Sequence, residues 1–174
     1  MKIAVIGAGI FGITSALKLK ESGHEVVIFE SNTDILQGAS RCNQYRLHRG
    51  YHYPRSTEML QSTIEFETEF KDCILNSGYE RYYAIASEGS KVSSDEYLSY
   101  LEGNQLKYSI IDRLDVIKED SVDLIVKVEE NSFDYEKLYL TLHGRLNRVK
   151  VGVKFNQYFT SQLSEEFDIV VNCT

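Results

Sequence analysis

Three glycines and one glutamate near the start of the chain have the types and spacing that suit a dinucleotide. Gly7, Gly9 and Gly12 stand at the G-x-G-x-x-G spacing, and Glu30 follows roughly 20 residues later. In such a turn the first glycine permits a tight bend, the second lets a pyrophosphate approach the backbone, and the third lets helix and strand pack closely. A carboxylate at Glu30 can bind a ribose but repels a 2′-phosphate, so the pattern disfavours NADP.

A second group of reactive side chains lies within residues 46–55, which hold two histidines, three arginines and two tyrosines. A histidine imidazole exchanges protons near neutral pH, so His48 is a candidate general base. Tyr53 and Arg55 are candidates for binding a substrate carboxylate, because an arginine can hold one through two parallel hydrogen bonds. A second interpretation stays open for all three, in which they only anchor and solubilise a loop.

The glycines lie between elements that would position a dinucleotide. Residues 3–6 form an apolar run typical of a buried parallel strand, and residues 25–30 predict a second strand that ends at Glu30. Between them, residues 10–22 carry apolar side chains on one helical face, and Gly23 is placed to cap that helix. The start of this helix would point its backbone N–H groups and its positive dipole end at phosphates.

Composition restricts the function further. The chain has 174 residues, 43% of them hydrophobic and 26% charged, which is ordinary for a globular protein. A net charge of −7 argues against nucleic acid and anionic membranes as partners. No apolar run approaches the ~20 residues that span a bilayer. The three cysteines show no metal-ligand spacing, which indicates no metal site and reduced thiols in a cytoplasmic protein.

The rest of the chain predicts two domains of an α/β protein. Residues 31–54 read as a long functional loop, and a helix capped by Ser56 is expected to end at Ser77-Gly78. Later strands are expected at 81–86, 105–111, 122–128, 150–155 and 167–171, with helices at 94–101 and after Asp134. We therefore expect a Rossmann-like domain with a parallel sheet from residues 1–80 and 149–174, and part of an inserted antiparallel substrate-binding module from residues 81–148.

These features resemble one family, the FAD-dependent oxidoreductases of the D-amino-acid oxidase type. The resemblance is strong from Gly7 to Glu30 and distinctive from Asn43 to Ser56, where Asn-x-x-x-Leu-His-x-Gly-x-x-Tyr-Pro-x-Ser is similar to a segment of the L-2-hydroxyglutarate group. The closing Asp-Ile-Val-Val-Asn-Cys-Thr resembles the strand with which the family returns to its FAD/NAD(P)-binding domain.

The resemblance implies FAD as cofactor and oxidation of a small hydroxy acid, amino acid or amine by hydride transfer to the flavin. His48, Tyr53 and Arg55, chosen above for their chemistry, are then the candidates on the substrate side of a family fold whose function the resemblance implies. On the cofactor side it implies the residues of the glycine turn and helix start, the end of the second strand and the following loop: Gly7, Gly9, Ile10, Phe11, Gly12, Glu30, Ser31, Ser40, Arg41 and Asn43.

The chain departs from the family pattern in two places. Gln44 and Tyr45 stand where family members carry glycines, and the chain stops at Thr174, whereas family members continue. We therefore expect an N-terminal portion that binds FAD weakly and turns nothing over alone. An NAD-dependent dehydrogenase and a non-catalytic dinucleotide-binding fragment remain alternatives. The sequence leaves the substrate, the electron acceptor and the oligomeric state open.

Overall fold

The computed structural model describes residues 1–56, 58–75 and 78–174. The chain divides into two compact units, one formed by Met1–Gln44 with Tyr135–Thr174 and the other by Tyr45–Asp134. The first is an α/β unit with a parallel sheet and the second contains antiparallel sheets, so the predicted fold class is confirmed. Within the described residues, no helix combines the length and the hydropathy needed to cross a membrane.

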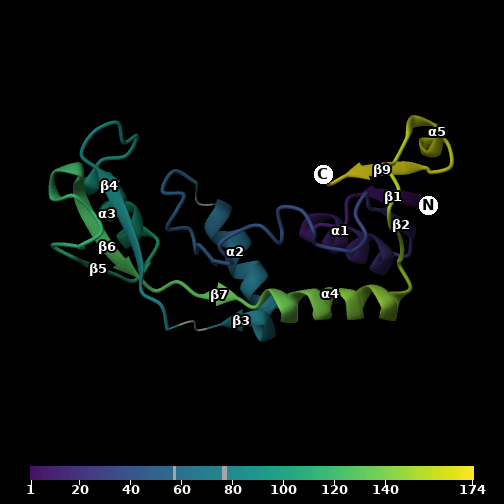
Figure 1. Ribbon diagram of the computed structural model, residues 1–174, viewed down its shortest axis with the longest axis horizontal. Helices are drawn as coiled ribbons and strands as arrows, with labels where there is room; N and C mark the ends of the chain where they lie inside the picture. The colour runs from purple at the N-terminus through teal and green to yellow at the C-terminus, as the bar shows by residue number, and fades with distance from the viewer. Residues whose placement is uncertain (57, 76–77) are drawn as a thin grey trace. The chain divides into compact units, whose positions relative to one another are not determined.

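The first unit is built around a four-stranded parallel sheet in the order β8-β2-β1-β9, and Figure 1 labels three of its strands, β1, β2 and β9. The residue pairs Ile3–Val26 and Ile3–Ile169 set the register of β1 with its two neighbours, β2 and β9. Its elements are β1 (Lys2–Ile6), α1 (Ile10–Glu21), β2 (Glu25–Phe29), α4 (Tyr135–Val149), β8 (Gly152–Lys154), α5 (Ser161–Ser164) and β9 (Ile169–Asn172).

Helix α1 follows the predicted pattern closely. It buries Ile13, Ala16 and Leu17 against the sheet, and Gly23 follows its end with a φ of +87°, a conformation that glycine adopts without strain. Helix α4 buries Leu138 at a spacing of four residues from the next buried leucine and packs against α1. The β1–α1–β2 segment, which carries the glycine turn, is therefore held in place by a well-packed core.

The second unit pairs strands in the order β4-β6-β5 and β3-β7. A core of aromatic and aliphatic side chains from Tyr51, α3, β6 and their neighbours fills the space beside the larger sheet. Its elements are α2 (Glu58–Glu69), the 3₁₀ turn η1 (Lys71–Cys73), β3 (Ile74–Leu75), β4 (Arg81–Ala86), α3 (Ser94–Gly103), β5 (Tyr108–Ile110), the 3₁₀ turn η2 (Glu119–Ser121), β6 (Val122–Val128) and β7 (Ser132–Phe133).

The compact units meet at residues 44/45 and 134/135, whereas the sequence predicted domain boundaries at 80/81 and 148/149. Backbone hydrogen bonds from Leu47 to Asn131 and from Phe133 to Tyr45 tie the loop after residue 44 to the second unit. Helix α4, expected in the inserted module, instead packs on α1 in the first unit. The functional assignment of the two domains remains a proposal.

Helix α2 is shorter than predicted. It ends at Glu69 rather than at Ser77, and Ile74 pairs as a strand with Phe133. The backbone N–H of Asp134 also donates to the Cys73 carbonyl, so pairing with a distant segment overrides the helical periodicity. Residue 57, next to the expected cap Ser56, and residues 76–77, which include the expected end at Ser77, lie outside the described residues.

Two predicted strands are shortened by residues in left-handed backbone. The expected strand 105–111 is confined to Tyr108–Ile110, and Gln105 has a φ of +54°. The expected strand 150–155 is confined to Gly152–Lys154, between Lys150 and Asn156 with φ values of +58° and +54°. These conformations cannot continue a strand, so Gln105, Lys150 and Asn156 are excluded from the strands that were expected to reach or approach them.

Candidate functional site

The glycine turn between β1 and α1 has the geometry that its spacing predicts. Gly7 has a φ of +95°, which side chains rarely permit. A Cβ on Gly12 would lie 1.9 Å from the Gly7 carbonyl oxygen, so only glycine allows the helix to approach the strand this closely. These two glycines are required by the fold itself.

Gly9 is different, because an added Cβ would meet nothing closer than the Ser40 hydroxyl at 3.5 Å, an ordinary contact. The Ser40 oxygen also accepts a hydrogen bond from the Ile10 N–H at 3.2 Å. Ser40 thus reaches the start of α1. The first turn of this helix contains no acidic side chain, and its residue Phe11 is exposed. The helix start is electrostatically suited to a phosphate.

Glu30 lies at the end of β2 and is buried. Its Oε2 accepts from the Ala8 N–H at 2.7 Å, and its Oε1 accepts from the backbone and side-chain amides of Asn32, both at 2.8 Å, and from the Ser31 hydroxyl at 3.3 Å. Burial alone would raise the pKa of Glu30, but the hydrogen bonds from Asn32, Ala8 and Ser31 outweigh it and lower that pKa. The carboxylate is therefore ionised at neutral pH and rigidly held beside the glycine turn.

The remaining predicted cofactor residues lie on the first unit's surface. Asn43 donates its side-chain amide to the carbonyls of Ala39 at 3.1 Å and Ser40 at 2.9 Å, which closes the loop that places Ser40. Ser31 and Arg41 are exposed. The structure thus joins Ser40 to the glycine turn and gives Asn43 a role in shaping the loop.

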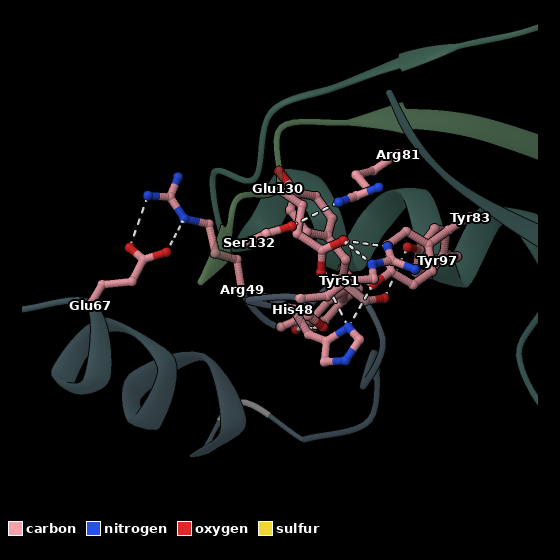
Figure 2. A network of polar contacts seen from close by, with 12 residues as sticks. His48, Arg49, Tyr51, Glu67, Arg81, Tyr83, Tyr97, Glu130 and Ser132 are labelled. Carbon is pink, nitrogen blue, oxygen red and sulfur yellow. Dashed lines mark hydrogen bonds and ion pairs between the residues drawn. The ribbon is translucent and has the colours of Figure 1, made fainter. Parts of the chain in front are cut away.

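A second polar cluster lies in the other unit, around the buried carboxylate of Glu130 (Figure 2). Arg46 donates to its Oε2 through both Nε, at 2.9 Å, and a terminal nitrogen. The Tyr83 hydroxyl donates to its Oε1 at 3.1 Å, and the His48 Nδ1 lies 3.2 Å from the same oxygen. His48, the predicted base, is therefore paired with a carboxylate.

The charges within this Glu130 cluster are set by burial and by the arginine. Burial by itself would raise the pKa of the Glu130 carboxyl. Hydrogen bonds from His48, Arg46 and Tyr83 and the charge of Arg46 outweigh burial and lower the pKa below its usual value, so the group stays ionised. Burial and the charge of Glu130 both raise the pKa of Tyr83, which keeps the hydroxyl protonated.

The other predicted substrate residues lie close to His48 in sequence and are exposed. The Tyr53 ring packs edge-on against His52 at 4.9 Å between centroids, and the His52 ring lies 5.3 Å from His48. Arg55 is exposed. Arg49 forms an ion pair with Glu67 at 2.7 Å, separate from the Glu130 cluster.

Sequence reasoning missed Glu130, Tyr83 and Asn32. Asn32 is separated from Glu30 by one residue, and an amide just after the strand end is a signal that could have suggested it. Glu130 follows an alternating strand and stands next to Glu129, so nothing local distinguishes the two. Tyr83 is one of 12 tyrosines. Within residues 1–56, 58–75 and 78–174, no three His, Cys, Asp or Glu side chains are grouped to hold a metal ion.

The fold and the glycine turn define a dinucleotide-binding protein of the Rossmann type. The family model described as "FAD dependent oxidoreductase" (DAO) matches residues 2–120, and the chain belongs to this family. FAD is the cofactor of the family.

Relatives with similar sequences match less than half of the chain. The FAD-dependent monooxygenase kojA of Aspergillus flavus is 41% identical over 70 residues, which are 40% of this chain and 16% of the relative. A 4,4'-diapophytoene desaturase of Staphylococcus aureus is 37% identical over 85 residues, which are 49% of this chain and 16% of the relative.

Solved structures share the fold over most of the chain. The L-proline dehydrogenase of P. horikoshii matches 99% of this chain and 52% of its own, with a TM-score of 0.66 and 14% identity. The glycine oxidase of Geobacillus kaustophilus matches 89% of this chain and 46% of its own, with a TM-score of 0.63 and 12% identity. The chain thus spans about half of these structures and 16% of the sequence relatives above.

The residues of the first unit fit the adenosine and pyrophosphate parts of FAD. Gly9 leaves open the approach to the N-terminus of α1, where a phosphate would lie. Among the described residues, Oε2 of Glu30 accepts only the Ala8 N–H, so it retains a lone pair for a ribose hydroxyl. Gly7, Gly9, Glu30 and Ser40 are the residues that would hold this part of the cofactor.

Proposed function

We propose that the first unit binds FAD and that the protein oxidises a small hydroxy acid, amino acid or amine. The observation that carries the proposal is the glycine turn with the buried, ionised Glu30 beside it. When bound, FAD would accept the hydride from the substrate carbon, and the protein would position the substrate and manage the proton.

His48 would take the proton from the substrate hydroxyl or amine as the hydride leaves the neighbouring carbon. Tyr53 and Arg55 would bind a substrate carboxylate, and their exposure leaves both side chains accessible to a ligand. Ile10, Phe11, Ser31, Arg41 and Asn43 complete the proposed cofactor set. The motif from Asn43 to Ser56 makes 2-hydroxy acids such as L-2-hydroxyglutarate the first substrates to test.

A panel of substrates tests this function. Because the 174 residues alone are expected to turn nothing over, the test uses FAD-loaded protein extended past Thr174. It is mixed without oxygen with L-2-hydroxyglutarate, D-2-hydroxyglutarate, glycine, L-proline or glycerol 3-phosphate, and the visible absorbance of oxidised flavin is followed. We expect one of the acids or amino acids to bleach the flavin. Dithionite serves as a control that the bound flavin can be reduced. Bleaching by dithionite but by no member of the panel would contradict the proposed oxidation of these substrate classes.

A further inference from the structure

We propose that Glu130 is a positioning residue that holds the proton of neutral His48 on Nδ1 and leaves Nε2 as the basic nitrogen. Only the role of Nε2 as the atom that takes the substrate proton rests on the proposed function. The arrangement itself lies wholly within the second unit, where His48 follows the segment bridged to β7 and Glu130 stands between β6 and β7.

The hydrogen-bond roles follow from counting donors. The Nδ1 atom of His48 lies 3.1 Å from the Tyr83 hydroxyl oxygen and 3.2 Å from Oε1 of Glu130. The tyrosine has one hydroxyl proton, which it donates to Glu130 at 3.1 Å, so it offers only a lone pair to the imidazole. An ionised carboxylate also offers only lone pairs. Nδ1 thus faces two acceptors and must be the donor.

Glu130 can fill this role because Arg46 stabilises its negative charge through the other carboxylate oxygen. Arg46 binds Oε2, and its guanidinium lies 5.1 Å from the centre of the Tyr83 ring. The side chain of Glu130 has no exposed surface, whereas that of Arg46 is 18% exposed. A buried carboxylate paired in this way is costly to protonate or to move, so it fixes the orientation of the group that it binds.

The opposite edge of the imidazole is open. The His48 side chain is 37% exposed, and Figure 2 shows its second ring nitrogen on the side away from Glu130. An imidazole whose Nδ1–H is bound to a carboxylate presents a basic Nε2, and the carboxylate stabilises the imidazolium that forms when Nε2 takes a proton. The groups that face the ring are Glu130, Tyr83, Arg46 through the shared carboxylate, and His52.

The protonation state of each ring nitrogen can be read directly by NMR. The ¹⁵N-labelled 174-residue chain is prepared without FAD, and multiple-bond ¹H–¹⁵N correlation spectra are recorded at a pH at which the imidazole is neutral. The chain has four histidines, and the signal lost in His48→Asn identifies His48. Free imidazoles in water favour the proton on Nε2, so a proton on Nδ1 reports the effect of the cluster.

We expect wild-type His48 to carry its proton on Nδ1. Glu130→Gln should shift the population towards the Nε2–H form, because the neutral amide no longer offers a charged acceptor. Glu67→Gln is the matched control: it makes the same substitution in the Arg49–Glu67 pair of the same unit and should leave His48 unchanged. Tyr83→Phe should retain the Nδ1–H form, because the carboxylate remains.

A wild-type spectrum with the proton on Nε2 would overturn the proposal, and so would an unchanged tautomer in a folded Glu130→Gln variant. The wild-type spectrum is decisive even if Glu130→Gln fails to fold. Because no flavin is present, the tautomer can be read whether or not the protein binds FAD or oxidises a substrate. Failure of the proposed function and failure of this inference are therefore separate results.

Discussion

His48→Asn is expected to slow reduction of the bound flavin by about 10²–10⁴-fold, the usual cost of losing a general base, while FAD affinity stays the same. The Asn amide can still donate towards Glu130, as the His48 Nδ1 is positioned to do at 3.2 Å, so the local packing should survive. The amide cannot accept a proton at neutral pH. The loss should therefore appear in the reduction step alone.

Stopped-flow absorbance of FAD-loaded wild type and His48→Asn, both extended past Thr174 and mixed with the substrate found in the panel, measures this step. His143→Asn, the same substitution on the exposed face of α4, is the control and should reduce its flavin at the wild-type rate. Equal rates for His48→Asn and wild type would remove His48 as the base. A lower melting temperature with an unchanged rate would give His48 a purely structural role, and Tyr53 and Arg55 would be tested next.

Gly9→Val is expected to weaken FAD binding by roughly 5- to 150-fold, because its side chain would occupy the space through which the pyrophosphate approaches. Overpacking of this kind costs about 1–3 kcal/mol, and each 1.4 kcal/mol is a factor of about ten in affinity. The fold should be retained, since the nearest atom to a Cβ at this position is the Ser40 oxygen at 3.5 Å.

Gly12→Ala supplies the contrast for this experiment. Its Cβ would lie 1.9 Å from the Gly7 carbonyl oxygen, so it should destabilise the fold and lower the melting temperature by several degrees, about 2–4 °C for each kcal/mol lost. Calorimetric FAD titration and thermal melting of both variants separate the two effects. Full FAD affinity in Gly9→Val would contradict the assignment of the glycine turn to the pyrophosphate.

The β1–α1–β2 unit could be predicted from sequence because each of its signals is local. The apolar run, the glycine spacing, the helical face of α1 and the position of Glu30 all lie within 30 consecutive residues, and the structure places them as expected. Local preference and tertiary packing agree here, which is the condition under which patterns are reliable.

The Glu130 cluster could not be predicted because its members are distant in sequence. Arg46 and Glu130 are separated by 84 positions, and His48 and Tyr83 by 35. The same kind of long-range contact explains the early end of α2, where Ile74 pairs with Phe133 against the helical pattern. Hydrophobic periodicity reports only on local structure, so the sequence indicated the candidate base His48 but not its partner Glu130.

The central claim, that the first unit is an FAD site, is tested most directly by calorimetric titration of the 174-residue chain with FAD and, separately, with NADP. The ionised Glu30 beside the glycine turn should accept an unmodified ribose and repel a 2′-phosphate. We predict that FAD binds more tightly than NADP. Tighter binding of NADP than of FAD would contradict the account.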